Sequence, residues 1–424
     1  MVADNLTVNC KARPRTVMKA HPQRNTNRRE SDKDSRKKSV YPAILAYGFR
    51  PFFLLAGIHA ALAIPAWIIS LYGHYLPASP LPAYSWHAHE MIFGFVAAAM
   101  AGFILTAVPS WTGRRGFAGA PLVGLTLLWL AGRVVMTFPS GMSALVIAVI
   151  DLSFLPALAF TILPSLMRSG NRRNFAFIGV LTALFAANLH FHFNGAVDID
   201  PLRFAINVVL VLVVIVGGRL LPPFTSSGLK QHGADIRIPR HPLLDRTALI
   251  AVIAVLIVDL IAPGATLAAV VSAIAALLLS LQLARWQGQR TLHEPLLWVL
   301  HVGYAWLPVA LTLKAAWLFA VPIPGTSWLH ALTTGAFSTM ILAVMSRAAR
   351  GHTGRALIAP RSMVVAYILL TGAAFTRVFG PILYADAWAL WVGIAAVLWS
   401  LSFTLFVIVY APILCSPRAD GRAG

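Results

Sequence analysis

The sequence predicts an all-α protein, a polytopic membrane bundle of about twelve transmembrane helices. Hydrophobic residues make up 58% of the 424-residue chain and charged residues only 11%, whereas soluble domains carry roughly 25% charged residues. From residue 51 onward, apolar stretches of about twenty residues recur, and each can cross a hydrocarbon core of roughly 30 Å. Lys and Arg gather in every second connection between these stretches, a bias that membrane insertion produces.

The connections between the apolar stretches set the helix count and the orientation. Those at 73–85, 139–141 and 321–327 contain no Lys or Arg, whereas the alternate ones contain several each. This alternation predicts that both termini are cytoplasmic. The predicted helices are 51–72, 86–109, 118–138, 142–168, 175–194, 203–222, 244–262, 264–284, 296–320, 328–350, 361–384 and 386–415.

The two ends of the chain differ from its middle in composition. Residues 1–40 hold eleven of the 34 Lys and Arg and almost no large apolar residue, which predicts a disordered basic cytoplasmic tail. The transmembrane domain is expected over 41–416, and a short cytoplasmic tail over 417–424. Although the net charge is +20, the basic residues are scattered between apolar spans, so the expected partner is the lipid bilayer and not nucleic acid.

Cysteine usage excludes several kinds of site. Cys10 and Cys415 lie at opposite ends of the chain, and no Cys-x-x-Cys-His motif occurs. A disulfide framework, a Cys-rich metal cage and a haem attached through thioether bonds are therefore all excluded.

Five histidines are predicted to lie at one level of the membrane, near its outer face. His87 and His89 open the second span, which runs inward; His190 and His192 close the fifth, which runs outward; His330 opens the tenth. Imidazole is the usual protein ligand of haem iron, copper and zinc. The sequence therefore indicates a histidine-ligated metal site at the outer ends of these three helices.

The two His-x-His pairs carry a geometric constraint. Residues two apart on a helix point about 200° away from one another, so one helical pair serves two centres, or one centre while the other imidazole forms hydrogen bonds. Only an unwound backbone at 86–90 would let His87 and His89 share an ion. We expect His87 to ligate haem with His190 or His192, and His330 to belong to a second centre.

Three cations in the outer halves of neighbouring spans have two interpretations. Arg133 and Arg377 offer planar forks that match the carboxylates of haem propionates. Alternatively they pair with Glu90, Asp151 or Asp259. For Lys314 we expect the side chain to snorkel to the outer headgroups.

Two further histidines lie away from the outer level. His301 is in the cytoplasmic third of the ninth span, about 8 Å from that edge by helical rise, and is expected to be remote from the other five. His59, in the middle of the first span, is expected to be a hydrogen-bonded core histidine.

Several long motifs give the chain a family resemblance. They are YGFRPFFLLAG (47–57), WHAHEMIFGF (86–95), AGFILTAVPSWTG (101–113), LHVGYAWL (300–307), HALTTGAFSTMILAVMSRAARGHTGR (330–355) and YAPIL (410–414). With these in order, nearly everything from residue 41 onward resembles the NnrS family. The resemblance implies a bacterial inner-membrane protein with about twelve helices, which acts in the nitric oxide response and denitrification and contains haem and copper.

A fainter resemblance is to the catalytic subunits of haem–copper oxidases. His87 to Phe93, reading H-x-x-x-M-I-F, is similar to their second-helix motif, whose histidine binds the low-spin haem. HALTTG at His330 is similar to their copper-binding helix, and HFH at His190 and His192 to a pair that serves two haems. The adjacent His-His copper pair and the His-Pro-Glu-Val-Tyr motif are missing, and His301-Val-Gly-Tyr304 matches only in part.

The resemblance to the NnrS family thus implies a protein that holds haem and copper and binds nitric oxide, and the missing Cys-x-x-Cys-His motif makes the expected haem a non-covalent, b-type one. The candidate cofactor-binding residues are His87, His89, His190, His192, Arg133 and Arg377, and the candidate metal ligands are His87, His192, His330 and His301. Oxidoreductase activity with an unidentified electron donor is one outcome, and no catalytic residue is assigned. The alternatives are a proton- or ion-coupled transporter or channel that uses the same residues, and an assembly or sensing protein without turnover.

Overall fold

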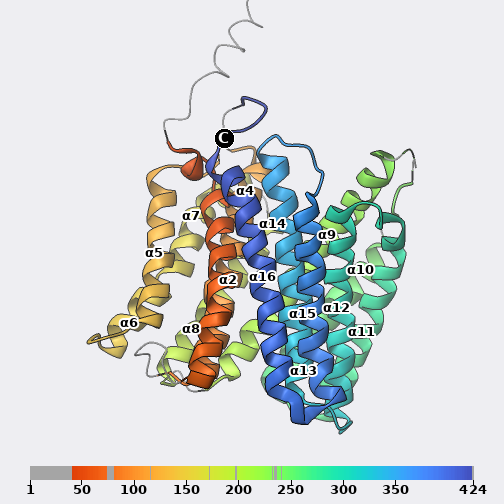
Figure 1. Ribbon diagram of the computed structural model, residues 1–424. Helices are drawn as coiled ribbons and strands as arrows, with labels where there is room; N and C mark the ends of the chain where they lie inside the picture. Colours follow the sequence, from red (N-terminus) through yellow and green to blue (C-terminus); the bar gives the residue numbers. More distant parts are fainter. Residues whose placement is uncertain are drawn as a thin grey trace, which may run out of the picture.

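The computed structural model describes residues 41–73, 81–114, 116–170, 172–195, 198–231, 233, 236–239 and 241–422. These residues form helices and connecting segments, with no strand among them (Figure 1). The prediction of a basic tail over 1–40 concerns residues outside the described part of the chain.

The helices form twelve runs of membrane-spanning length, because several short helices continue one another without a turn. In chain order they are η2 (Ala43–Leu45), α2 (Phe49–Gly73), α3 (Ala83–His89), η3 (Glu90–Val96), α4 (Ala97–Thr112), α5 (Ala120–Thr137), α6 (Ala144–Leu152), α7 (Phe154–Ser169), η4 (Arg172–Phe175), α8 (Ala176–Phe193), α9 (Asp200–Gln231), α10 (Pro242–Ile261), α11 (Thr266–Arg285), η5 (Gly288–Thr291), α12 (Pro295–Leu318), α13 (Gly325–His330), η6 (Ala331–Phe337), α14 (Ser338–His352), α15 (Arg361–Leu383), η7 (Ala385–Ala387) and α16 (Trp388–Cys415).

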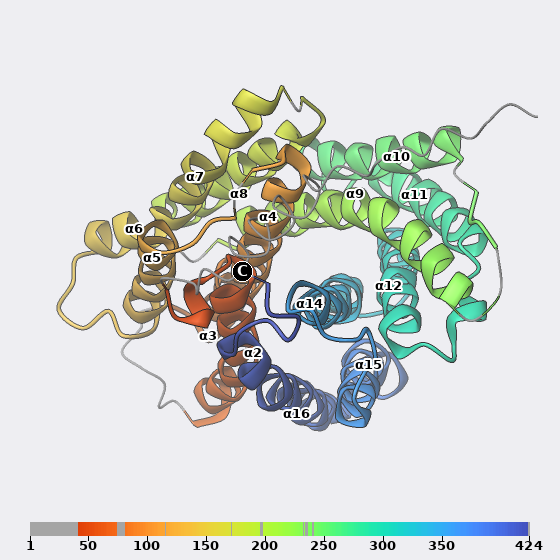
Figure 2. The same cartoon turned by 90° about the horizontal axis from the view of Figure 1, so that it is seen from above.

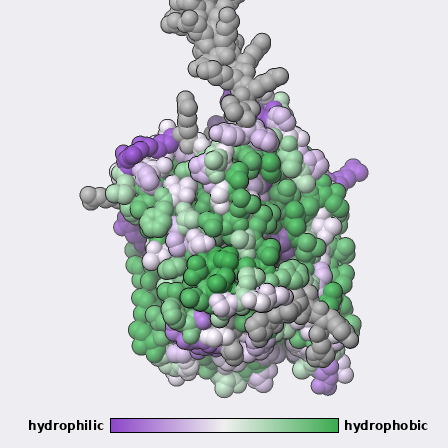
Figure 3. All heavy atoms as spheres, turned by 90° about the vertical axis from the view of Figure 1, so that its left-hand side faces the viewer, coloured by the Kyte–Doolittle hydropathy of each residue, from purple (hydrophilic) through white to green (hydrophobic). Residues whose placement is uncertain are grey.

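Eleven of these runs are long and apolar enough to cross a membrane. The twelfth, α10, has twenty residues but carries Asp245, Arg246 and Asp259. Hydrophobic side chains cover the middle of the face shown in Figure 3, and hydrophilic ones lie toward its two ends. The prediction of a multi-pass helical membrane protein is confirmed.

Two predicted spans have different limits in the structure. The span expected over 203–222 continues through Pro222 and Pro223 to Gln231, where the hydroxyl of Ser226 accepts a hydrogen bond from the Ile238 amide (2.9 Å) and so ties the extra turns to the following segment. The span expected over 142–168 is interrupted at Ser153, between α6 and α7. This interruption follows directly after Asp151, a residue of the site described below.

Helix α14 occupies the centre of the bundle. Viewed from above, it is surrounded by α2, α4, α9, α12, α15 and α16 (Figure 2). Its buried positions include small side chains such as Ala343, Ser346 and Ala349, which let neighbouring backbones approach closely in a membrane. The helix is preceded by α13 and η6, so His330 lies among the central elements, toward the end of the bundle opposite the C-terminus (Figure 1).

Close packing of α9 against α12 predicts a stability effect at Gly217. A Cβ atom there would lie 2.6 Å from Cε2 of Tyr304, whose ring is fully buried and whose hydroxyl donates to Gln282 Oε1 (2.7 Å). Because this ring is held at both ends, we expect Gly217→Ala to lower the free energy of unfolding by about 1–3 kcal/mol. Gly179→Ala, where nothing lies within 4 Å of the new atom, is expected to be neutral or slightly stabilising. Denaturant unfolding in mild detergent would compare them, and equal stabilities would contradict the prediction.

Candidate metal centre

Two of the histidine-bearing helices change their winding at the candidate site. α3 ends at His89 and continues as η3, a π-helix over Glu90–Val96. α13 ends at His330 and continues as η6, a π-helix over Ala331–Phe337. Such segments are rare and often occur at functional sites, and here both begin directly after a candidate ligand.

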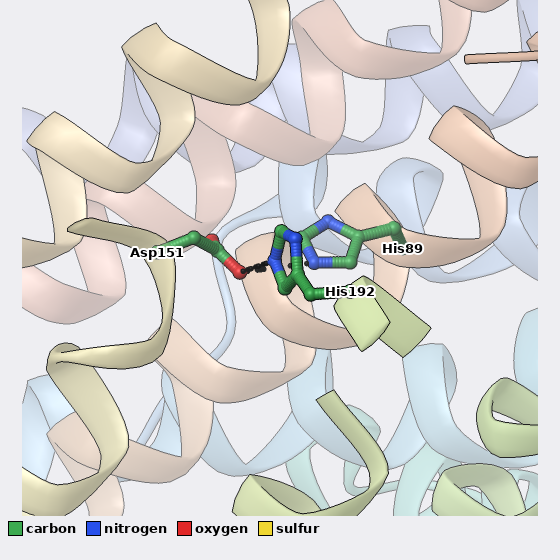
Figure 4. A group of neighbouring side chains, drawn as sticks. All are labelled: His89, Asp151 and His192. Carbon is green, nitrogen blue, oxygen red and sulfur yellow. Dashed lines mark hydrogen bonds and ion pairs between the residues drawn. The ribbon is translucent and has the colours of Figure 1, made fainter. Parts of the chain in front are cut away.

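Asp151 is the centre of a buried polar network, the Asp151 network, formed with His89, His192, Asn188, Arg133, Glu90 and His59. Three groups converge on its Oδ2 atom: Nε2 of His89 and Nε2 of His192, each at 3.1 Å, and the side-chain amide of Asn188, which donates at 2.7 Å. Figure 4 shows the two imidazoles approaching this carboxylate. His89, Glu90 and Asp151 are buried in the protein.

Arg133 provides the positive charge of this network. Its Nη1 donates to Glu90 Oε1 and its Nη2 to Asp151 Oδ1. The second oxygen of Glu90 lies 3.3 Å from Nε2 of His59, on α2. Buried charges in a membrane are costly unless they are paired, and the guanidinium bridges both carboxylates.

The charge of the Asp151 network leaves room for one more cation. With neutral imidazoles, Glu90, Asp151 and Arg133 sum to one negative charge. Both ring nitrogens of His89 face oxygen atoms, Nδ1 toward Glu90 Oε1 (3.3 Å) and Nε2 toward Asp151 Oδ2. This arrangement requires either a proton on each nitrogen or a metal ion in place of one proton.

The donor atoms of this network suit a transition metal. One ligand atom each from His89, Asp151 and His192 lie within 4.8 Å of one another. Two imidazoles and a carboxylate form a set that binds iron(II), zinc or copper. Asn188 and Arg133, which contact the same carboxylate, would orient it as outer-shell partners do in metal sites.

His87 points to different surroundings, as its spacing from His89 predicts. Together with His330 and Arg377 it lines a largely apolar cavity, the His87 cavity, which is walled further by Trp67 and Trp399. The His87 ring stacks on Trp67 with centroids 4.3 Å apart. Its Nδ1 is buried and has no hydrogen-bond partner among the described residues, a state that is rare unless a ligand completes the site.

His330 is held with one nitrogen free. Its Nδ1 lies 2.8 Å from the carbonyl oxygen of Thr326, so Nδ1–H donates to that oxygen and Nε2 keeps its lone pair. A backbone carbonyl that fixes the tautomer in this way is typical of metal-ligating histidines.

Arg377 gives the His87 cavity a positive edge. It is 7% exposed, and its Nη1 atom has no hydrogen-bond partner within the described part of the chain. A buried guanidinium calls for an anion, and a carboxylate is the anion that its fork fits best.

The side chains of the His87 cavity suit a haem, but the volume of the cavity does not. The two imidazoles could bind the iron, and the arginine could pair with a propionate. With the side chains as they stand, however, the His87 cavity measures about 160 Å³, whereas small-molecule sites span roughly 300–1,000 Å³. Holding a haem therefore requires the walls, which include the flexible Met91, to move apart.

The structure groups the predicted site residues differently from the expected pairing. His87 lines the same cavity as His330, whereas the His192 ring lies 5.9 Å from that of His89, so the structure does not pair His87 with His190 or His192. His190 is exposed, with Nε2 3.0 Å from Asn194 Nδ2.

His301 contributes to neither group of histidines. Its Nε2 is 2.9 Å from the Thr225 hydroxyl. His301 lies in the N-terminal half of α12, whereas Lys314 lies in the C-terminal half.

The expectation for Lys314 was wrong. It does not snorkel: its side chain is 2% exposed and donates to Asp259 Oδ2. A carboxylate within reach on α10 stabilises the ammonium without its leaving the protein interior.

Sequence reasoning gave Asp151 and Asn188 no place among the ligands. The sequence does hold a signal for Asp151, because an ionisable carboxylate in an apolar span is a functional candidate. Ser153, which interrupts the helix two residues later, adds to that signal. Asn188 lies four residues before His192, one helical turn away and therefore on the same face.

The fold and these two groups of side chains define a class of protein, a polytopic membrane protein with a buried histidine–carboxylate centre. The chain belongs to the NnrS family, whose model matches residues 43–418 and is described as NnrS protein. Membership of this family indicates a membrane protein of the nitric oxide response. No curated protein matches the sequence.

Proposed function

We propose that this chain is a haem- and copper-binding protein of the bacterial inner membrane that binds nitric oxide at a histidine-ligated metal centre. His87 and His330 would hold haem iron, with Arg377 pairing a propionate. His89, His192 and Asp151 would hold copper. In this arrangement both centres lie on the periplasmic side, with both termini in the cytoplasm.

One observation carries the proposal. His87, His330 and Arg377 line the same cavity, and each offers a group suited to binding: an orphaned imidazole nitrogen, an imidazole whose tautomer is fixed, and an orphaned guanidinium. No protein group described in the structure satisfies the orphaned atoms, so a ligand with a metal and a carboxylate would satisfy all three together.

The protein's own residues define what the centre would do. If His87 and His330 both held the iron, the centre would favour electron transfer, so nitric oxide binding would require one of the two imidazoles to leave a position open. The largely apolar walls of the His87 cavity would disfavour water and admit a small neutral gas. Glu90, which contacts His89 (3.3 Å) and is not among the candidate ligands, could hold or release a proton beside the second centre.

An optical spectrum with metal analysis tests the proposal. Purified wild-type protein in mild detergent is expected to show a Soret band that shifts with nitric oxide, together with bound iron. His87→Ala and His330→Ala are each expected to lower haem occupancy at least about tenfold, because each removes an iron ligand.

The matched control is His190→Ala, which removes an exposed imidazole outside both groups and is expected to leave the spectrum unchanged. Wild-type protein with neither a Soret band nor iron would refute the haem proposal and favour the transporter alternative. Loss of haem in both His87→Ala and His190→Ala, with His330→Ala unaffected, would instead support the pairing of His87 with His190 that the sequence suggested.

A further inference from the structure

A second cavity, the Asn207 cavity, lies outside the two groups described above. It measures about 640 Å³ and is bounded by residues of α8, α9, α10, α12 and α13. Polar residues in its wall include Asn207, Asp259 and Lys314, and aromatic ones are Phe204, Trp317 and Trp328. The volume falls within the range of small-molecule sites, roughly 300–1,000 Å³.

The charges of the Asn207 cavity are balanced. Lys314 pairs with Asp259, and Arg203, also in the wall, pairs with Asp200 at 2.7 Å. Because each of these cations already has a carboxylate partner, an anionic ligand would have to displace one. The cavity therefore favours a ligand without net charge and disfavours phosphate and anionic lipid headgroups.

Asn207 presents an unused hydrogen-bond acceptor. Its Nδ2 donates to Asp259 Oδ2 (2.8 Å), which fixes the orientation of the amide. Its Oδ1 is then left buried without a hydrogen-bond partner among the described residues, and the residue is 3% exposed. Buried acceptors almost always have a partner, so this atom calls for a donor on a ligand.

Lys314 and the aromatic residues of the wall provide the other groups that would contact a ligand. The ammonium of Lys314 lies 4.9 Å from the ring centre of Trp328 and has three N–H groups, so its pairing with Asp259 leaves it able to donate to a ligand oxygen. Trp317 and Phe204 offer flat apolar surfaces for a ring. Leu260, 66% exposed in the cavity wall, extends an apolar surface toward the outside of the bundle, where a hydrocarbon tail can lie.

We propose that the Asn207 cavity binds the headgroup of a membrane hydroquinone, a neutral ring with hydroxyl groups and an apolar tail. Asn207 Oδ1 accepts a hydrogen bond from one hydroxyl, and Lys314 Nζ, which contacts the same Asp259 oxygen as Asn207, donates to an oxygen of the same headgroup. Thr326, whose carbonyl holds His330, also lines this cavity. The occupant would therefore lie close to a residue of the His87 cavity. Binding does not depend on metal, so the haem proposal and this one fail separately.

Calorimetric titration of purified protein with decylubiquinol under anaerobic conditions tests the proposal. Saturable binding is expected, and the oxidised form, decylubiquinone, is expected to bind about five- to tenfold more weakly because it has no hydroxyl for Asn207. Asn207→Leu is expected to weaken decylubiquinol binding by the same factor and to abolish the preference for the reduced form.

Two further variants make the test independent of folding defects. Ala186→Phe places a larger side chain at an exposed position of the wall and is expected to block binding while the protein remains folded. Asn174→Leu removes another buried asparagine, which accepts from Arg219 at 2.9 Å and does not line the cavity, and is expected to bind normally.

Several outcomes would overturn the proposal: a titration that does not saturate, a preference for decylubiquinol that survives in Asn207→Leu, or binding unaffected by Ala186→Phe. Equal competition by phosphatidylglycerol would identify the site as one for an anionic headgroup and would also overturn it.

Discussion

Arg133→Leu is expected to lower the free energy of unfolding by about 3–5 kcal/mol. The guanidinium contacts both Glu90 and Asp151, and these carboxylates are buried. Removing it leaves two like charges without their shared cation, which is far more costly than losing an exposed ion pair. Denaturant unfolding in mild detergent, followed by tryptophan fluorescence, would measure the change.

Arg203→Leu is the matched control for this experiment. Its guanidinium also pairs with an aspartate, Asp200, but both side chains are at least half exposed, and exposed pairs contribute about 0–1 kcal/mol. If the two variants unfold at the same denaturant concentration, Arg133 does not stabilise the Asp151 network more than an exposed ion pair would.

Asp151→Asn and His192→Ala are each expected to reduce bound copper at least about tenfold while leaving haem iron in place. Both replaced groups offer ligand atoms to the same candidate metal site, and neither lines the His87 cavity. Losses of this size are usual even when an outer-shell partner of a metal ligand is removed. Elemental analysis of the purified variants, with copper and iron measured on the same samples, provides the test.

His301→Gln serves as the comparison, because this imidazole bonds to Thr225 and belongs to neither group. It is expected to retain both metals. Copper that is unchanged in Asp151→Asn and His192→Ala, or equally reduced in His301→Gln, would remove the second centre from the proposal.

The span count follows from sequence because it depends on local properties. Apolar length and the alternation of Lys and Arg specify how often the chain crosses the membrane. They do not specify which helix lies in the centre. α14 is central because small residues such as Ala343 and Ser346 let several neighbours approach, and this depends on surfaces supplied by other helices.

The sequence predicts that the histidine-bearing ends of these helices lie close together, but it does not predict which histidine meets which partner. Direction of travel along each span predicts which helix ends share a level, and in the structure His89 meets His192 while His87 and His330 line one cavity. Partners depend on how each helix is rotated, and the π-helical segments after His89 and His330 change that rotation without a marker in the residue pattern. Arg133 and Arg377 had the same two interpretations from sequence, and only the position of Asp151 distinguishes them.

The π-helical segments let the second and tenth spans hold one residue more than a regular helix of the same length. A π-helix bonds to the carbonyl five residues back and not four, so it contains an additional residue compared with a regular helix between the same points. Deleting one residue within 91–95 would restore α-helical winding between these points and leave the directions of His87 and His89 nearly unchanged. The same deletion in the regular helix α8, ahead of His192, would turn the residues beyond it by about 100° and take His192 away from Asp151.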